Sequence, residues 1–300
     1  MAKASLKALP LDIRKTLGLI SGIAEEGDKP LYLDILVDET LSKAMREACR
    51  QAFHPAGINL TVSLQTYAGQ ADRTLAQKLL PEPDLPGTAE QADLVVILAN
   101  RSPWTAELFF KTRRSHPVVI VAEDIMAFVA AWPDTVDIDT ACLIALTNDQ
   151  VRQSFDALFA NLAAWILETQ VDLSLSWARG LKFIRQLHAA EIVNSTALQN
   201  GVIATIDLLP GKDMPVLLLN QTRMFFRLAA ISGIEFTGQP YNELAALIVQ
   251  GFAWRGLARR LSVSLPAISW AIKGTVGYLG TLALGKLALH YLDFKLREAR

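Results

Sequence analysis

The stretch DLVVILANRSPWTAELFFKTRRSHPVVIVA, residues 93–122, decides the fold of the first half of the chain. It opens and closes with apolar runs rich in Val, Ile and Leu, 93–99 and 117–122, which are typical of strands buried on both faces of a sheet. Between them, Ser102 followed by Pro103 predicts the start of a helix that ends near Arg114. A strand, a helix and a second strand in this order predict a right-handed parallel βαβ unit.

The same alternation extends in both directions from this unit. Apolar runs predict further strands at 31–37, 59–66 and 140–147, and helical patterns predict helices at 40–53, 71–80 and 125–132. An apolar stripe at helical spacing predicts a closing helix over 147–166, with Thr147 and Gln150 at capping-box spacing. We therefore expect a small, doubly wound, Rossmann-like α/β domain with a five-stranded parallel sheet over residues 1–168.

The loops after these strands lack the residues that nucleotide chemistry requires. A phosphate-binding turn needs glycines, which let backbone N–H groups approach the phosphate, and usually a following Lys and Ser or Thr. Residues 38–43, DETLSK, contain no glycine and place two carboxylates where an anion would bind, so we expect Lys43 to face solvent on a helix. Residues 100–102 lack a phosphoacceptor acid, and residues 122–124 lack the Asn-Lys-x-Asp pattern that reads guanine. We expect no catalytic residue and no cofactor in this domain.

Acidic side chains still follow two of the predicted strands. Asp38 and Glu39 come after the first strand, and Glu123 and Asp124 come after the fourth, so the four could meet at one edge of the sheet. One interpretation is that they are helix N-terminal acids, which the helix dipole favours. The other is that the four carboxylates bind a cation or a cationic partner.

Composition and charge separate the two halves of the chain. The 300 residues are 51% hydrophobic and 20% charged, which is enough for a large core and for about two domains. Residues 1–170 carry 15 Lys and Arg against 22 Asp and Glu, whereas residues 171–300 carry 14 against 8. The two halves could attract each other, the basic half could meet an anionic surface, or both could be ordinary solvated faces.

Cysteine and histidine usage points to a reduced compartment without a metal. Cys49 and Cys142 are far apart and belong to no metal-binding motif, which fits the cytoplasm better than a disulfide framework. The four histidines show no ligand spacing, so we expect no metal site. The short apolar stretch at 16–24 is broken by glycines and followed by acids, so we do not interpret it as a signal peptide.

The second half of the chain is predicted to be entirely helical. Helical patterns cover 173–197, 216–231, 242–261 and 266–297, and we assign them to a hairpin or bundle domain over residues 169–300. Residues 195–233 are strongly apolar but are broken at 210–215 by PGKDMP. No run reaches the roughly 20 apolar residues that a membrane-spanning helix needs. We expect a hairpin packed inside the protein, with a hairpin that dips into a membrane as the alternative.

A row of small residues punctuates the last predicted helix. Gly277, Thr281 and Gly285 repeat every four residues, with Gly274 and Gly280 close by. Each glycine costs a helix about 1 kcal/mol relative to alanine, so a compensating contact is needed. A face of small residues lets another helix backbone approach closely. We expect the partner to be the 216–231 helix or a second copy of the chain.

Several short motifs in the helical half resemble one known family. They are Ala197–Asn200, Leu209–Gly211, Asp213–Leu217, Asn220–Gln221, Gly251–Phe252, and the run from Ala271 through Lys273 and Gly274 to Gly285. Over about residues 175–292 the chain resembles the YcjF-related family of unknown function, whose helical domain is often encoded behind or fused to small GTPase domains. The resemblance implies that the first domain is a degenerate GTPase-like domain. It implies no established activity and no catalytic residue, and some members are regarded as membrane-associated.

Four polar residues near the hairpin have two interpretations. Asp213 lies in the predicted turn, where it can cap the following helix, and Asn220 and Gln221 lie inside an apolar helix. Buried amides need partners, because an unsatisfied one costs about 1–3 kcal/mol. Either these side chains fix the register of the hairpin, or Asp213, Asn220, Gln221 and Lys273 form a polar pocket between helices.

The function that the sequence favours is protein interaction or regulation without catalysis. A helical docking module would bind a protein partner or a second copy, in the cytoplasm. The first alternative is a peripheral protein that inserts the 195–233 hairpin into an anionic membrane surface, at the inner face of the membrane. A weaker alternative is a small-molecule enzyme working at the strand ends, where Asp38 and Asp124 would converge on an enclosed pocket. Nucleic-acid binding is not expected, because the Arg255, Arg259 and Arg260 group is a single helix end.

Overall fold

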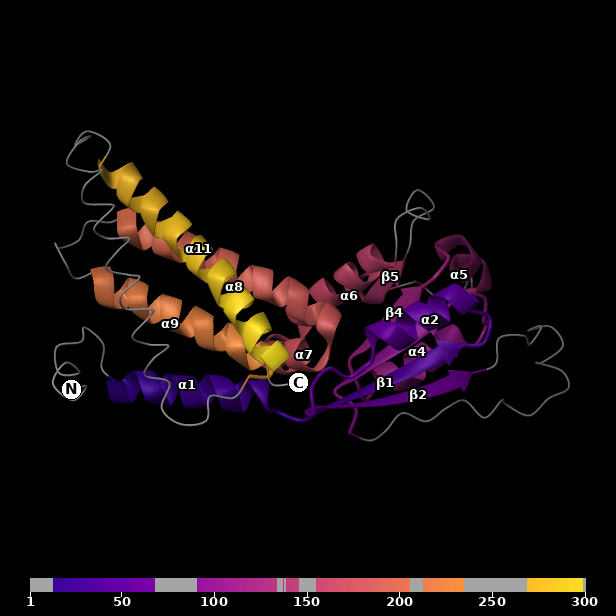
Figure 1. Ribbon diagram of the computed structural model, residues 1–300. Helices are drawn as coiled ribbons and strands as arrows, with labels where there is room; N and C mark the ends of the chain where they lie inside the picture. Colours follow the sequence, from indigo (N-terminus) through magenta and orange to yellow (C-terminus); the bar gives the residue numbers. More distant parts are fainter. Residues whose placement is uncertain are drawn as a thin grey trace, which may run out of the picture. The chain divides into compact units, whose positions relative to one another are not determined.

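The computed structural model (Figure 1) describes residues 13–67, 91–133, 137, 139–145, 155–205, 213–234 and 269–298, without the side chains of 13–17, 213, 214 and 269. The chain divides into two compact units. The first, which we call the sheet unit, is Lys29–Leu187, and the second, the helical unit, combines Met1–Asp28 with His188–Arg300. This division differs from the predicted boundary at residue 168. It also assigns the N-terminal segment to the helical unit.

The sheet unit contains the predicted five-stranded, all-parallel sheet. Its strands are β1 (Leu31–Asp38), β2 (Leu60–Tyr67), β3 (Leu94–Ala99), β4 (Val118–Ala122) and β5 (Leu143–Ala145). They are ordered β2-β1-β3-β4-β5, and Leu33 of β1 pairs with Val62 on one side and Leu94 on the other. β3 and β4 are buried at every position, as their uninterrupted apolar sequences predict.

Helices cover both faces of this sheet. They are α2 (Lys43–Ala52), α4 (Thr105–Arg113), α5 (Ile125–Ala131), α6 (Asp156–Thr169) and α7 (Ser174–Gly180). Phe109 of α4 and Phe128 of α5 belong to the core on one face, which includes alternate strand residues such as Ile97. Phe53, just after α2, makes an edge-to-face contact with Phe159 of α6 in a second aromatic cluster. Because neighbouring strand residues point to opposite faces, the uninterrupted runs of β3 and β4 supply both cores.

The structure corrects several local predictions in the sheet unit. The helix expected from Pro103 begins at Thr105, and no side chain caps it. The strand expected from residue 140 begins only at Leu143, because a 3₁₀ turn at Thr140–Cys142 precedes it, and residues 146 and 147 lie outside the described residues. The predicted helix at 71–80 and the capping box at Thr147 lie outside the described residues.

The single helix predicted over 173–197 is two helices. α7 ends at Gly180, Leu181 is extended with φ −123° and ψ 125°, and α8 then runs over Lys182–Thr205. A Cβ on Gly180 would lie 3.0 Å from the Cβ of Leu60, so close packing against β2 accompanies the break. α8 also continues eight residues beyond the predicted end.

The helical unit consists of four described helices. They are α1 (Ile13–Gly27), the part of α8 from His188, α9 (Asp213–Ser232) and α11 (Ser269–Glu298). In Figure 1, α1 (indigo) runs beside α9 (orange), although the whole sheet unit separates them in sequence. The sequence did not predict α1. Of the described helices, none is both long and apolar enough to cross a membrane, and the predicted 242–261 helix lies outside the described residues.

Candidate functional site

The sheet topology locates the edge where a ligand is expected to bind. β1 and β3 are neighbours in the middle of the sheet, and the chain leaves them towards opposite edges, to β2 and to β4. In open parallel sheets, ligands bind beyond the carboxyl ends of the strands at such a switch point. The loops that begin at Asp38 and Asn100 therefore form the first candidate site.

The Asp38 carboxylate fills the centre of this switch point. Its side chain is 0% exposed. Oδ1 accepts hydrogen bonds from the backbone N–H and the hydroxyl of Thr40, both at 2.8 Å. Oδ2 accepts from the backbone N–H groups of Asn100 and Ser102, both at 2.9 Å. The carboxylate thus joins the loop after β1 to the loop after β3.

Other side chains at this edge also form hydrogen bonds within the protein. Glu123 Oε2 accepts from the backbone N–H of Ser42 at 2.9 Å. The Ser42 hydroxyl caps α2, and Lys43 is the first residue of that helix. Ser42 and Lys43 therefore form the N-terminus of α2. Tyr67, at the end of β2, hydrogen-bonds to Leu98 O and the Thr105 hydroxyl, and burial together with the Asp38 charge raises its pKa.

The predicted strand-end candidates therefore have separate structural roles. Asp124 caps α5, where its Oδ1 accepts from the N–H groups of Met126 at 2.9 Å and Ala127 at 3.2 Å. This role fits the helix N-terminal interpretation. Asp38 instead bridges two loops. A phosphate at this edge would need free backbone N–H groups. Four of these groups already donate to the carboxylates of Asp38 or Glu123, and they belong to Thr40, Ser42, Asn100 and Ser102.

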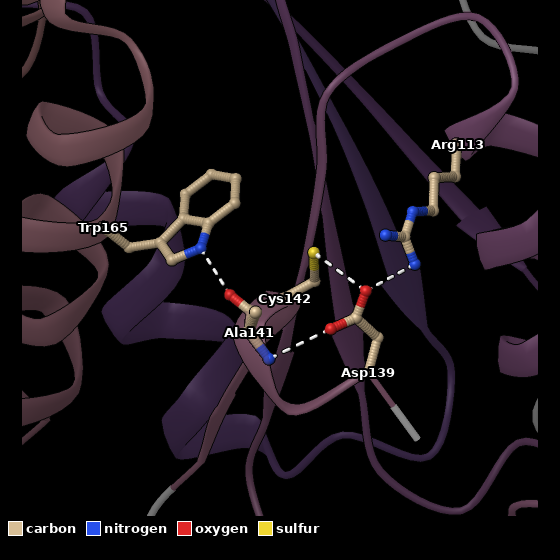
Figure 2. Close-up of polar contacts among 5 residues, drawn as sticks. All are labelled: Arg113, Asp139, Ala141, Cys142 and Trp165. Carbon is tan, nitrogen blue, oxygen red and sulfur yellow. Dashed lines mark hydrogen bonds and ion pairs between the residues drawn. The ribbon is translucent and has the colours of Figure 1, made fainter. Parts of the chain in front are cut away.

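A second polar cluster lies near β5 and includes one of the two cysteines (Figure 2). Asp139 Oδ2 forms an ion pair with Arg113 at 2.5 Å and is 3.9 Å from the Cys142 Sγ. Asp139 Oδ1 accepts from the N–H of Ala141, whose carbonyl accepts the Trp165 indole N–H at 2.7 Å. Burial and the Asp139 charge raise the pKa of Cys142, although Arg113 acts in the opposite direction. Such an environment disfavours the thiolate that a nucleophile requires.

We expect both cysteines to react slowly in the folded protein. Burial, with the charge of Glu123, raises the pKa of Cys49 to about 12, so about one Cys49 thiol in 10,000 is ionised at pH 8. Cys49 should react with iodoacetamide at least about a thousandfold more slowly than a free cysteine, and Cys142 should also react more slowly than one. Peptide mass spectrometry over a time course measures both rates. Equal rates in the folded and urea-unfolded protein would contradict this expectation.

The helical unit contains a buried network of uncharged polar side chains. Asn200 of α8 and Thr281 of α11 are both 0% exposed, and Asn200 Nδ2 donates to Thr281 Oγ1 at 2.9 Å. Asn220 Nδ2 of α9 donates to Asn200 Oδ1 at 2.9 Å, and Gln221 Nε2 donates to Thr281 Oγ1 at 3.2 Å. The Thr281 hydroxyl in turn donates to the carbonyl of Gly277. The network therefore joins α8, α9 and α11 at one level.

Two of the four predicted pocket residues belong to this network. Asn220 and Gln221 meet Asn200 and Thr281 there, which fits the interpretation that they fix helix register. Lys273 is half-buried on α11, eight residues before Thr281. The Asp213 side chain lies outside the described residues, although its backbone begins α9.

The glycines of α11 lie against α8. A Cβ on Gly277 would be 2.8 Å from the Cβ of Ala204 and 2.9 Å from the carbonyl oxygen of Asn200. Gly274 faces Gly201 and Thr205 in the same way, and Gly285 faces Val193. Gly280 is buried. The helix that faces these glycines is thus α8, which we did not predict, while α11 also contacts the expected α9.

Replacement of Thr281 tests whether the network stabilises the helical unit. Thr281→Val keeps the shape but removes the acceptor of two buried amides, so we expect a loss of about 2 kcal/mol in the free energy of unfolding. Thr275→Val, at an exposed position of the same helix, is the control and should change little. Urea denaturation measures both, and similar midpoints for the two variants would contradict a stabilising network.

Sequence reasoning missed some of these residues. The sequence singled out Asn200 only as part of a family-like motif and Thr281 only as a small residue. Their hydrogen-bonding role was not predicted. A buried polar residue on each of three apolar helices could have predicted the network. Among the described residues, no group of three or more His, Cys, Asp or Glu side chains could hold a metal ion. Comparison of the chain with models of protein families, with curated proteins and with solved structures found no match.

Proposed function

We propose that this protein is a non-catalytic interaction or regulatory protein, in which a nucleotide-type α/β domain accompanies a helical docking module. The observation that carries the proposal is the Asp38 carboxylate, which accepts four hydrogen bonds at the switch point of the sheet. An anion approaching there would have to displace a buried carboxylate. The degenerate GTPase-like character and the YcjF-related resemblance remain predictions, as does a cytoplasmic location.

The docking part of the proposal rests on one face of α11. Beside the buried positions Leu284 and Leu292, the helix exposes Leu279, Leu287 and Phe294. Leu287 and Phe294 are separated by two helical turns, so they share one side of the helix. Exposed apolar side chains in a row favour a protein partner or a second copy of the chain.

Nucleotide titration tests the non-catalytic part of the proposal. We expect neither heat on calorimetric titration with Mg²⁺ and ATP or GTP nor release of phosphate. Lys43→Ala should behave identically, because Lys43 begins a helix whose cap is Ser42. Hydrolysis by the wild-type chain that is lost in Lys43→Ala would overturn the proposal.

Site-specific photocrosslinking tests the docking part. A photoreactive residue at 287 or 294 should give covalent protein adducts in cells, including adducts between copies if the chain self-associates. The matched control is position 293, which is also exposed but points away from Phe294. Adducts at 293 alone, or at none of the three positions, would contradict docking through this face.

A membrane surface is the second candidate partner. Leu198, Val202 and Val216 are exposed on the α8–α9 hairpin, where an inserting segment would present apolar side chains. If the hairpin inserts, the wild-type chain should float with anionic liposomes at low salt. The double variant Val202→Glu/Val216→Glu should float less, because its hairpin is charged. Failure of the wild-type chain to float would exclude this candidate.

A further inference from the structure

His188 is a buried histidine with one ring nitrogen engaged and the other unpartnered. It lies where α8 enters the helical unit, and its residue surface is 7% exposed. Its Nδ1 is 3.2 Å from Glu191 Oε2, three residues further along α8. Nε2 is buried and has no hydrogen-bond partner among the described residues. A neutral imidazole fits this arrangement, because Nδ1–H donates to Glu191 and Nε2 carries only a lone pair.

Charged groups on three helices act electrostatically on this imidazole. They are Glu191 on α8, Arg227 on α9 and Glu26 on α1. Burial lowers the pKa of His188 below its ordinary 6.5, and the Arg227 cation acts in the same direction. The Glu191 hydrogen bond and the two carboxylate charges oppose this shift without cancelling it. Burial also lowers the pKa of Arg227, against the charge of Glu26.

α1 and α9 approach each other closely near His188, but the described apolar side chains of α1 are not fully buried in this contact. A Cβ on Gly27 would lie 3.3 Å from the Cβ of Ala230, so the helices approach closely at their ends. The described large apolar side chains of α1, which are Leu19, Ile20 and Ile23, are only half-buried. These three side chains bury only part of their apolar surface against the rest of the unit, and a local charge change can compete with that contact.

We propose that His188 is an acid-sensitive latch of the helical unit, whose protonation at Nε2 opens the junction of α1, α8 and α9. The added proton creates an N–H donor that has no acceptor among the described residues, and its positive charge is repelled by that of Arg227. Water can solvate the imidazolium only if the side chain leaves its buried position, which breaks its contact with Glu191. The charges of Arg227 and Glu26, which attract each other, then become more exposed to water as well.

The direction of the pH dependence follows from proton linkage. Above pH 6.5 both the closed and the open forms hold a neutral imidazole, so pH has no effect through this group. Below pH 6.5 the open form binds more protons, because the pKa of His188 is lower in the closed form. Each pH unit between these two pKa values therefore raises the open fraction by up to about tenfold.

Hydrogen–deuterium exchange of the full chain at pH 7.5 and 5.5 tests the latch. After correction for the intrinsic pH dependence of exchange, we expect peptides from α1 and from the start of α8 to exchange up to about tenfold faster at pH 5.5. His188→Gln should exchange equally at both pH values. His290→Gln, exposed on α11 of the same unit, is the matched control and should keep the wild-type response.

Two outcomes would overturn the proposal. One is wild-type exchange that does not depend on pH after correction, and the other is a pH response that persists in His188→Gln. Should that variant fail to fold, NMR titration of the His188 ring in the wild-type chain decides. A midpoint clearly below 6.5, with broadening of α1 and α9 resonances in the same range, supports the latch. A midpoint at 6.5 or higher overturns it.

Discussion

Asp38→Ala should lower the free energy of unfolding of the sheet unit by roughly 4 kcal/mol. The substitution removes a fully buried carboxylate and leaves the N–H groups of Thr40, Asn100 and Ser102 without their acceptor. A buried donor that loses its partner costs about 1–3 kcal/mol, and here several lose it together. The loss is a large part of the 5–15 kcal/mol that typically stabilises a domain. Urea denaturation followed by circular dichroism measures it.

A matched control and a chemical rescue make this prediction specific to the carboxylate. Glu39→Ala removes the neighbouring, exposed carboxylate and should change stability by less than about 0.5 kcal/mol. Formate or acetate should raise the melting temperature of Asp38→Ala more than that of the wild-type chain, because either anion can occupy the emptied position. Equal denaturation midpoints for Asp38→Ala and Glu39→Ala would show that the bridging carboxylate contributes nothing.

Gly277→Ala should destabilise the helical unit by about 1–3 kcal/mol, although alanine is the better helix former. The added Cβ would lie 2.9 Å from the backbone oxygen of Asn200, so α8 itself has to move, and Asn200 anchors the polar network. Gly22→Ala is the matched control, because a Cβ there meets nothing within 4 Å. That control should gain up to about 1 kcal/mol from helix propensity alone. Opposite shifts in melting temperature are expected, and shifts of the same sign would contradict close packing.

A double-mutant cycle at Gly285 extends this test to the other end of the helix pair. A Cβ at 285 would lie 2.5 Å and 2.7 Å from the two γ-carbons of Val193, which is stiff because it is β-branched. Gly285→Ala should therefore be destabilising, and Val193→Ala should relieve it by removing those carbons. The double variant should be more stable than the sum of the single effects predicts. Simple additivity would mean that the two side chains do not compete for space.

The parts of the fold that the sequence predicted are those with uninterrupted apolar patterns. The ends of β3 and β4 were predicted to within one residue. Both strands are buried on both faces, so their sequences are apolar throughout and the strand ends coincide with the ends of the apolar runs. The break at Leu181 was missed because the close approach of Gly180 to Leu60 that accompanies it involves a distant strand, which local sequence patterns do not contain. α1 was missed because its apolar face is short and gains its partner, α9, only in the folded chain.

The candidate sites were predictable by residue type but not by partner. Asp38 was singled out in the sequence because it places a negative charge after a buried strand, where a phosphate-binding domain would bind an anion. Its bridging role depends on Asn100 and Ser102, which the sheet brings beside it. Asn220 and Gln221 stood out for the same kind of reason, whereas their partners lie on α8 and α11. Pairing across elements needs the three-dimensional register, which local patterns do not contain.

The return of α1 to the helical unit also sets an order of events during synthesis. α1 leaves the ribosome first, but α9, on which it packs, follows about 190 residues later. At 5–20 residues per second this delay is roughly 10–40 s. Within that time all five strands emerge, so the sheet unit can fold while α1 has no surface to bind. A chaperone that shields short apolar helices would therefore have time to bind α1 before α9 emerges.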